Sequence, residues 1–223
     1  MTSPTPTPQS SALAATEALY HRLIAAEWEK SPADAAHDLG HLARVWANAR
    51  RIARTEGGDP ATLLAAAYFH DLVNLPKSAP NRDQASRLSA CAARPLLLAA
   101  GLSPAQTEGA CHAIEAHSFS ANLPALTIEA QILQDADRLE ALGAIGIARC
   151  FAVTGQLGGA LFDQTDPMAQ HRPLDDRAFA LDHFEVKLLL LPDKMQTDTG
   201  RALAGERAEW MLSFRTRLLS EIG

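Results

Sequence analysis

The sequence has few cysteines and no long apolar run, and these two absences restrict its class. Its three cysteines, Cys91, Cys111 and Cys150, are far apart and show no CxxC spacing. Such cysteines are typical of reduced thiols in a cytosolic protein and argue against a disulfide framework or a structural zinc site. The longest leucine run, Leu188–Leu191, is ended by Pro192 and is too short to span a bilayer.

An excess of basic residues is also lacking. The 20 Lys and Arg are outnumbered by 26 Asp and Glu, which gives a net charge of -6. This balance disfavours a nucleic-acid polymer as partner, because such polymers are bound through many phosphate contacts. A few cations in a local pocket would still suffice for one small phosphorylated molecule.

The N-terminal segment Met1–Ser11 lacks the basic region and the apolar run of a signal peptide. It is rich in Ser, Thr, Pro and Gln, and this composition predicts a disordered tail. We therefore expect a cytoplasmic protein without membrane association.

The remaining sequence has the composition of a globular protein. Of its 223 residues, 47% are apolar and 21% are charged, which predicts one domain over residues 12–223. We expect a core at about 31–151 and a C-terminal loop and helices over 152–223. Apolar residues recur at helical spacing and alternating β-type stretches are scarce, so we predict an all-α fold, a helical bundle. The expected helices are Ala12–Lys30, Asp38–Thr55, Pro60–Asp71, Arg82–Ala100, Pro104–Ala116, Ile128–Phe151, Arg177–Leu191 and Thr199–Ile222.

Local signals support one helix start and two long loops. Ser103, with Pro104 next and Gln106 three residues later, has the pattern of a capping box with proline at the first helical position. The polar stretches Leu72–Asn81 and Thr154–Asp176 are loops of a kind that often carries substrate contacts, although a flexible surface role is equally compatible with them.

Two histidines and an aspartate stand at positions that should face the core. His41 shares an expected helical face with Val45, and His70 shares one with Leu63. A lone inward histidine is more often a hydrogen-bonded core residue than a ligand. Here, however, Asp71 follows directly, and an unpaired carboxylate at the end of an apolar run would be costly to bury. The group therefore predicts a metal site.

A third segment, Gln131–Gly143, carries charges among apolar residues. Its charged side chains are Asp135, Asp137, Arg138 and Glu140. On spacing alone, a solvated stripe of an amphipathic helix and a functional site are equally compatible with this pattern.

His41, the His70–Asp71 pair and Asp137 follow one another in the order of an H…HD…D signature. With these residues the chain resembles the HD-domain metal-dependent phosphohydrolases. The flanking sequences agree, namely HDLGHLARV at 37–45, AAYFHD at 66–71 and DADRLEALG at 135–143. Segments 111–120 and 162–176 further resemble the YedJ-like bacterial branch of this superfamily.

The resemblance implies that His41, His70, Asp71 and Asp137 bind one divalent ion inside a helical bundle. Imidazole and carboxylate donors without thiolate suit Mn²⁺, Ni²⁺, Co²⁺, Fe²⁺ or Mg²⁺. Such an ion lowers the pKa of a bound water and neutralises charge on a phosphoryl group. The resemblance thus implies hydrolysis of a phosphate ester or anhydride, with cleavage of a nucleoside triphosphate to monophosphate and pyrophosphate as the leading reaction.

Water activation has several candidates. Some relatives carry a Glu three positions after the HD aspartate, whereas this chain has Asn74 there, and an amide cannot act as a general base. The work then falls to Glu140, Asp135 or the ion alone. His117 is expected to contact phosphate or water.

Substrate contacts are expected from one histidine and several cations. His37 is assigned to the substrate side of the metal ligands, and His112 to a structural role. The cations that could hold phosphate are Lys77, Arg82, Arg138 and Arg172, although each could equally be an ordinary surface residue.

Two alternatives to a phosphohydrolase stay open. One is a regulatory module that binds nucleotide or metal without turnover, for which Asn74 is the sequence hint. The other is a two-metal oxidative enzyme, which would need a second site from His112 and His117. In every case we expect a monomer or a homodimer.

Overall fold

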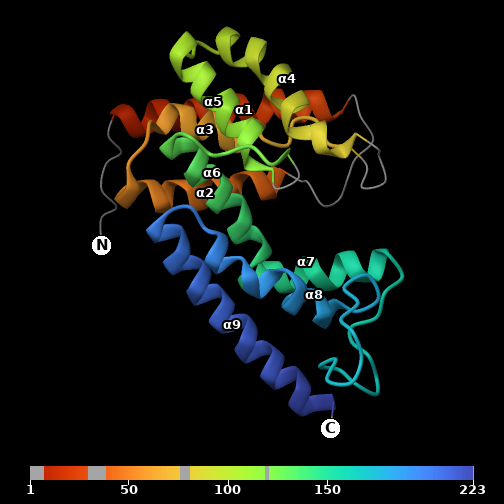
Figure 1. Ribbon diagram of the computed structural model, residues 1–223. Helices are drawn as coiled ribbons and strands as arrows, with labels where there is room; N and C mark the ends of the chain where they lie inside the picture. Colours follow the sequence, from red (N-terminus) through yellow and green to blue (C-terminus); the bar gives the residue numbers. More distant parts are fainter. Residues whose placement is uncertain (1–7, 30–38, 76–80, 119–120, 223) are drawn as a thin grey trace. The chain divides into compact units, whose positions relative to one another are not determined.

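The computed structural model describes residues 8–29, 39–75, 81–118 and 121–222. Within these ranges the chain is helical, with an isolated parallel bridge between Ala160 and Phe179, and the all-α prediction is confirmed. The chain divides into two compact units, Met1–Gln134 and Asp135–Gly223 (Figure 1), which we call the N-terminal and C-terminal units. The domain boundaries expected from the sequence stay a prediction.

The N-terminal unit begins with α1 (Pro8–Trp28) and α2 (Leu39–Glu56). Helix α1 starts earlier than the expected Ala12, within the segment expected to be a tail. Its Glu17 carboxylate accepts hydrogen bonds from Tyr68 Oη at 3.0 Å and from Trp46 Nε1 at 3.2 Å. One acidic side chain thus ties α1 to α2 and to the next helix.

Helix α3 (Pro60–Phe69) is the central helix of this unit. The Asp59 carboxylate caps it by accepting a hydrogen bond from the Thr62 N–H at 2.9 Å, and Pro60 occupies the first helical position. All residues from Thr62 to Phe69 are buried, because α1, α2, α4 and α5 all contact this helix. A helix that is apolar on every side needs such cover.

Helices α4 (Ala85–Ala99) and α5 (Pro104–His117) lie side by side (Figure 1). A 3₁₀ turn, η1 (Arg82–Gln84), replaces the first turn of the helix expected from Arg82. The capping box at α5 is confirmed: Gln106 N–H donates to Ser103 Oγ, and Ser103 N–H donates to Gln106 Oε1, both at 3.2 Å.

The single helix predicted over Ile128–Phe151 is wrong. Helix α6 (Ile128–Arg138) is followed by a 3₁₀ turn, η3 (Leu139–Ala141), and then by α7 (Gly143–Gln156).

Two glycines produce this break. Leu142 is extended, with φ -118° and ψ 162°, and Gly143 has φ +70°, a region that side-chain-bearing residues seldom adopt. A β-carbon on Gly146 would lie 2.2 Å from the carbonyl oxygen of Ala141. The chain therefore turns sharply where apolar periodicity alone would continue the helix.

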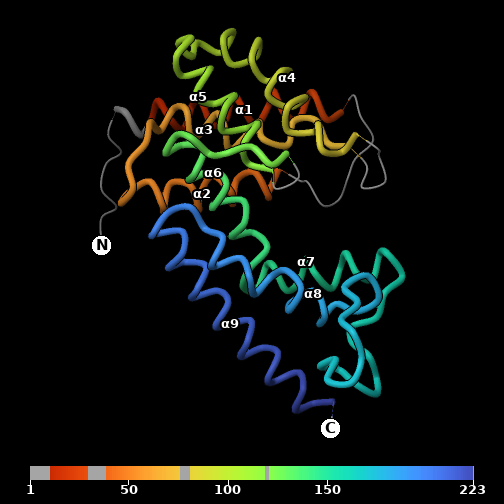
Figure 2. The backbone as a smooth tube through the Cα atoms, in the orientation of Figure 1, coloured from red at the N-terminus to blue at the C-terminus, as the bar shows by residue number. Residues whose placement is uncertain are grey.

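The C-terminal unit packs α7 against α8 (Ala180–Val186) and α9 (Asp198–Ile222). Phe151 of α7 lies between Phe184 and Phe214, with ring centroids 6.2 and 6.0 Å away. Two 3₁₀ turns, η4 (Leu188–Leu190) and η5 (Pro192–Lys194), connect α8 to α9, so the expected helix Arg177–Leu191 is shorter than predicted. Residues 157–179 form an irregular segment between α7 and α8 (Figure 2).

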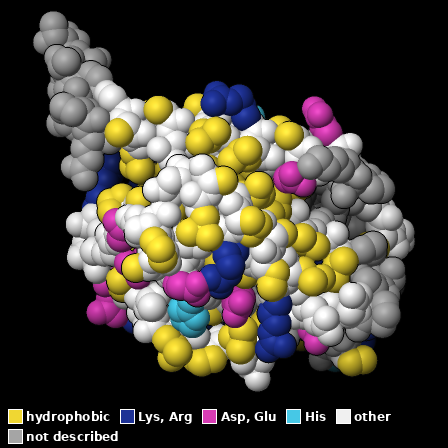
Figure 3. Space-filling model, turned by 90° about the horizontal axis from the view of Figure 1, so that it is seen from above, with side chains coloured by type: hydrophobic (Ala, Val, Ile, Leu, Met, Phe, Trp, Pro, Cys, Tyr) yellow, Lys and Arg dark blue, Asp and Glu magenta, His cyan; other side chains and the backbone are white. Residues whose placement is uncertain are grey.

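Two observations concern the described helices and surface. No described helix has both the length and the apolar character that crossing a membrane requires. On the described part of the face in Figure 3, Lys and Arg side chains are scattered among apolar and acidic ones rather than gathered into a basic patch.

Candidate metal centre

Helices α3 and α5 bring two histidines together at their C-terminal ends. At their N-terminal ends, Gln106 Nε2 donates a hydrogen bond to the Asp59 carboxylate at 3.0 Å. The two helices pack along each other from this contact to His70 and His117, whose ring centroids are 4.9 Å apart. The helix caps therefore help to set the register in which the imidazoles meet.

The His70 ring is oriented by its own helix. Its Nδ1 lies 2.9 Å from the carbonyl oxygen of Ala67, and since a carbonyl can only accept, Nδ1 carries the proton. In the neutral ring this leaves the lone pair on Nε2, which lies 3.3 Å from Asp71 Oδ2; in the protonated ring Nε2 also carries a proton and donates it to that carboxylate. The ring is almost fully buried.

His117 repeats this arrangement on α5. Its Nδ1 donates to the carbonyl oxygen of Ile114 at 2.6 Å, and its Nε2 lies 3.7 Å from Asp71 Oδ1. Imidazoles that bind metals commonly donate their other N–H in this way, which fixes the tautomer and the ring plane. The structure thus brings His117 together with His70 and Asp71.

His41 reaches the same carboxylate from α2. Its Nε2 lies 3.7 Å from Asp71 Oδ2, and its ring centroid lies 5.4 Å from that of His70. Ligand atoms of His41, His70 and Asp71 all lie within 4.8 Å of one another, so these residues could hold a metal ion.

Asp71 is at the centre of this group, which we call the histidine cluster: His41, His70, Asp71 and His117. Burial favours the neutral acid, but the charge of His70 and hydrogen bonds from His117 and His70 outweigh it and hold the pKa of Asp71 well below its usual range. An ionised carboxylate among imidazoles offers only oxygen and nitrogen donors. This donor set fits Mn²⁺, Ni²⁺, Co²⁺, Fe²⁺ or Mg²⁺.

The chain that follows the cluster is held to α4. The Val73 N–H donates to Ser89 Oγ at 3.0 Å, and the same hydroxyl donates to the Val73 carbonyl oxygen at 3.3 Å. Further on, Arg82 donates to the carbonyl oxygen of Leu75 at 2.5 Å. The structure therefore gives Arg82, a candidate phosphate contact, a role in shaping this loop.

Of three further histidine and lysine candidates, one lies among the described residues. His37 and Lys77 lie outside the described residues. His112 accepts a hydrogen bond from the Leu126 N–H through Nε2 at 3.1 Å, which agrees with the structural role expected for it.

Asp135 belongs to the C-terminal unit and anchors the start of α9. Its fully buried carboxylate accepts hydrogen bonds at 2.8 Å from the Gln196 N–H, the Thr197 N–H and the Thr197 hydroxyl. Burial raises the pKa of Asp135, although these hydrogen bonds oppose the shift. Both oxygens of this carboxylate are thus engaged in holding the segment that leads into α9.

The other charges of that segment also lie in the C-terminal unit. Asp137 is partly exposed on α6, and Glu140 on η3 is 2% exposed. Arg138 donates a hydrogen bond to the carbonyl oxygen of Lys194, and burial lowers the pKa of its guanidinium.

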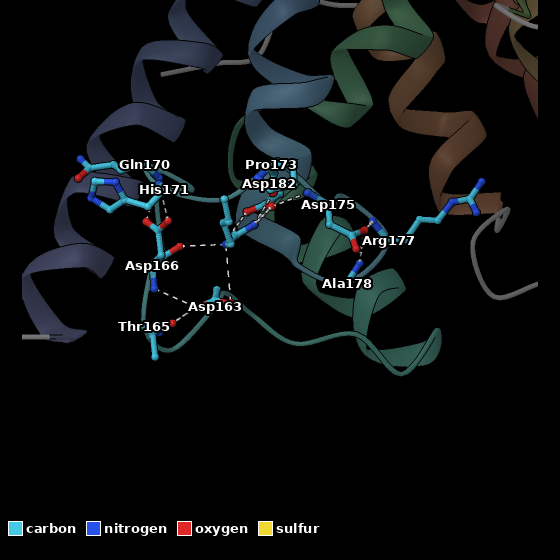
Figure 4. Close-up of polar contacts among 11 residues, drawn as sticks. Asp163, Thr165, Asp166, Gln170, His171, Pro173, Asp175, Arg177, Ala178 and Asp182 are labelled. Atoms are coloured by element: carbon cyan, nitrogen blue, oxygen red, sulfur yellow. Dashed lines mark hydrogen bonds and ion pairs between the residues drawn. The ribbon is translucent and has the colours of Figure 1, made fainter.

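Arg172 organises the irregular segment 157–179. Its guanidinium donates two hydrogen bonds, at 2.5 and 2.8 Å, to the carboxylate of Asp182, which is 1% exposed, and it lies 4.6 Å from the ring centroid of Phe179. Figure 4 shows Asp163 and Asp166 in the same network of contacts. The guanidinium of Arg172, a candidate phosphate contact, is thus already paired with carboxylates.

Sequence reasoning did not single out Asp59 or Gln134, which support the cluster from outside. Gln134 Nε2 donates to the carbonyl oxygen of Ala116 at 2.9 Å, next to His117. The Asp59–Pro60 pair is a recognisable helix start, whereas the contact of Gln134 has no signal in the local sequence.

Comparison with known proteins gives one family. The family model of the HD domain matches residues 38–142. The protein YpgQ of Bacillus subtilis (strain 168) is 36% identical over 191 residues, which cover 83% of this chain and 84% of YpgQ.

Solved structures agree. The crystal structure of Bacillus subtilis YpgQ in complex with ADP superposes with a TM-score of 0.72 at 31% identity and covers 94% of this chain and 96% of that one. An HD-superfamily hydrolase from Bacillus thuringiensis gives a TM-score of 0.73 at 30% identity, with coverage of 94% and 97%. The chain therefore belongs to the HD superfamily of hydrolases.

Proposed function

We propose that this protein is a metal-dependent phosphohydrolase that acts on a nucleotide. The observation that carries the proposal is the histidine cluster, in which the Nε2 atoms of three imidazoles approach one ionised carboxylate at 3.3 to 3.7 Å. Such an arrangement of buried, mutually oriented donors is costly to build without a ligand.

We assign the metal ligands as His41, His70, Asp71 and Asp137. The first three share one cluster. Asp137 completes the H…HD…D signature, and the family match over 38–142 extends across it.

A divalent ion at these ligands would supply an activated water and charge neutralisation at the phosphoryl group. The chain's own residues hold and orient the reactants. We assign to His117 Nε2 a contact with water or a phosphoryl oxygen, because it approaches Oδ1 of Asp71, whereas His41 and His70 both approach Oδ2. Glu140 is the proposed proton acceptor; Asp135 is the weaker candidate, because its carboxylate already accepts three hydrogen bonds from Gln196 and Thr197.

The proposed substrate is a nucleoside triphosphate, cleaved to monophosphate and pyrophosphate. Support for a nucleotide comes from YpgQ, which was crystallised with ADP. We propose His37, Lys77, Arg82 and Arg138 as substrate contacts. Arg82 and Arg138 each donate to a carbonyl, but a guanidinium has five N–H donors. Arg172 is not proposed as a substrate contact, because its guanidinium already donates two hydrogen bonds to Asp182.

A turnover assay tests the proposal. Metal-free protein is reloaded with Mn²⁺, Ni²⁺, Co²⁺, Fe²⁺ or Mg²⁺ and given a panel of nucleotides and other phosphorylated metabolites, with phosphate and pyrophosphate release measured separately. We expect pyrophosphate from a nucleoside triphosphate, and a loss of about 100-fold or more in Asp71→Asn, since even outer partners of metal ligands are worth 10- to 100-fold. Asp83→Asn, at an exposed acid, is the matched control.

Two outcomes would contradict the proposal. Release of neither product from any compound with any metal would exclude a phosphohydrolase of this class. Tight nucleotide binding without product over hours would instead support a regulatory module.

A further inference from the structure

Side chains donate hydrogen bonds to two of the last carbonyls of α5. The final carbonyls of a helix have no partner within it. At this end, the Ile114 carbonyl accepts from His117 Nδ1 at 2.6 Å, and the Ala116 carbonyl accepts from Gln134 Nε2 at 2.9 Å. The peptide that precedes His117 is therefore fixed from α6.

Gln134 makes this contact at a cost. The residue is 5% exposed, and its Oε1 is buried without a hydrogen-bond partner among the described residues. Burying an amide oxygen without a hydrogen-bond donor lowers the stability of the fold, because the oxygen loses its hydrogen bonds to water. A methionine would fill a similar volume without that cost, but it could not hold the Ala116 carbonyl.

The hydrogen bond from Gln134 to the Ala116 carbonyl lies next to the histidine cluster, which explains why an unfavourable buried amide is present there. His117 leaves the chain one residue after Ala116, and its Nε2 lies 3.7 Å from Asp71 Oδ1. The ring is held at Nδ1 by Ile114, but this bond fixes the ring only relative to its own helix end. The hydrogen bond from Gln134 holds that helix end against α6.

We propose that Gln134 is a positioning residue for His117, and that its amide sets the direction from which the imidazole meets Asp71. For activity this inference rests on the proposed function, but the position of the ring can be measured without turnover. Gln134 does not touch the reacting atoms; it acts through the Ala116 peptide.

The test compares Gln134→Met with a matched control, Thr107→Val. Thr107 lies on α5, is 1% exposed, and also has a buried oxygen without a partner in the described chain. Both substitutions remove an unpaired polar atom and preserve volume, but Gln134→Met also leaves the Ala116 carbonyl without its donor, so its unfolding midpoint should fall further than that of Thr107→Val. Only Gln134→Met removes a hydrogen bond next to the cluster.

The first readout is histidine ¹⁵N NMR of the metal-free protein. We expect the His117 ring signals to shift or broaden in Gln134→Met, while those of His112 stay unchanged and Thr107→Val leaves both as they are. Unchanged His117 signals would overturn the proposal.

The second readout is kinetic. We expect kcat/KM to fall about 3- to 10-fold in Gln134→Met, the effect of one neutral hydrogen bond, and to fall no further when the substitution is added to His117→Ala. An equal loss in both backgrounds would show that Gln134 acts independently of His117 and would contradict the proposal. If the parent protein shows no turnover, the proposed function fails, and the NMR comparison still decides the role of Gln134.

Discussion

Replacing Asp135 with alanine is expected to lower the free energy of unfolding, and not only the rate of turnover. The carboxylate accepts three hydrogen bonds of 2.8 Å from Gln196 and Thr197. Gln196 is exposed, so water can replace its acceptor, but Thr197 is 4% exposed. Its N–H and hydroxyl would lose their acceptor at about 1–3 kcal/mol each. Since the variant also avoids burying a charge, we expect a loss of about 3 kcal/mol in the free energy of unfolding.

Gly200→Ala is expected to disturb the same hydrogen bonds between Asp135 and Thr197, because Gly200 packs directly against them. A β-carbon there would lie 2.3 Å from Asp135 Oδ2 and 2.7 Å from Thr197 Oγ1, so the carboxylate must move. Because both changes disrupt one set of hydrogen bonds, their effects should not add: Gly200→Ala should cost less in the Asp135→Ala background than alone.

Urea denaturation of the metal-free protein, followed by circular dichroism, measures these losses, with Asp193→Ala at an exposed acid as the control. A loss below about 1 kcal/mol in Asp135→Ala, together with abolished turnover, would refute the reasoning and restore Asp135 as the general base.

Three further predictions concern other parts of the molecule. Asp59→Ala should cost about 1–2 kcal/mol at pH 7 through loss of the α3 cap. Burial opposes the shift, but hydrogen bonds from Thr62 and Gln106 hold the pKa of Asp59 below its ordinary 3.8. This stabilisation is complete above that pH and is lost as pH falls through the lower folded pKa, so the difference from the parent, measured by urea denaturation, should shrink below about pH 4; a constant difference would count against it. Arg172→Met should increase protease cleavage within 157–179 and leave KM unchanged; a raised KM with normal protease resistance would instead make Arg172 a phosphate contact. Removing bound metal with a chelator should abolish turnover and lower the thermal midpoint, because an ion that binds only the folded chain stabilises it; a midpoint that does not respond would argue against the cluster as the binding site.

The parts of the site that could be predicted are those with a local signal. His41 and His70 repeat with apolar residues at helical spacing, and Asp71 ends an apolar run, so the sequence itself indicates that they face inward. The start of α5 was equally readable, because Ser103 and Gln106 cap it through contacts three residues apart.

The parts that could not be predicted depend on distant partners or on backbone conformation. Asp135 has the same local sequence whether it is a base or an anchor, and its partner Gln196 lies 61 residues away. The break after Arg138 follows from the positive φ of Gly143 and the close approach at Gly146, while the apolar pattern continues across it. Arg172 looked like a surface cation because its buried partner, Asp182, is brought to it by the folded loop.

The hydrogen bonds of His70 and His117 make each imidazole both a member of the histidine cluster and a partner for the last carbonyls of its own helix. Holding either Nε2 in place therefore also holds the carbonyls of Ala67 or Ile114. Fraying of α3 or α5 by one turn would withdraw one of these imidazoles from the cluster, and metal binding at the cluster would suppress that fraying. Amide hydrogen exchange in these two final turns should consequently slow in proportion to metal occupancy, so the ends of two helices can report the state of the cluster without any substrate.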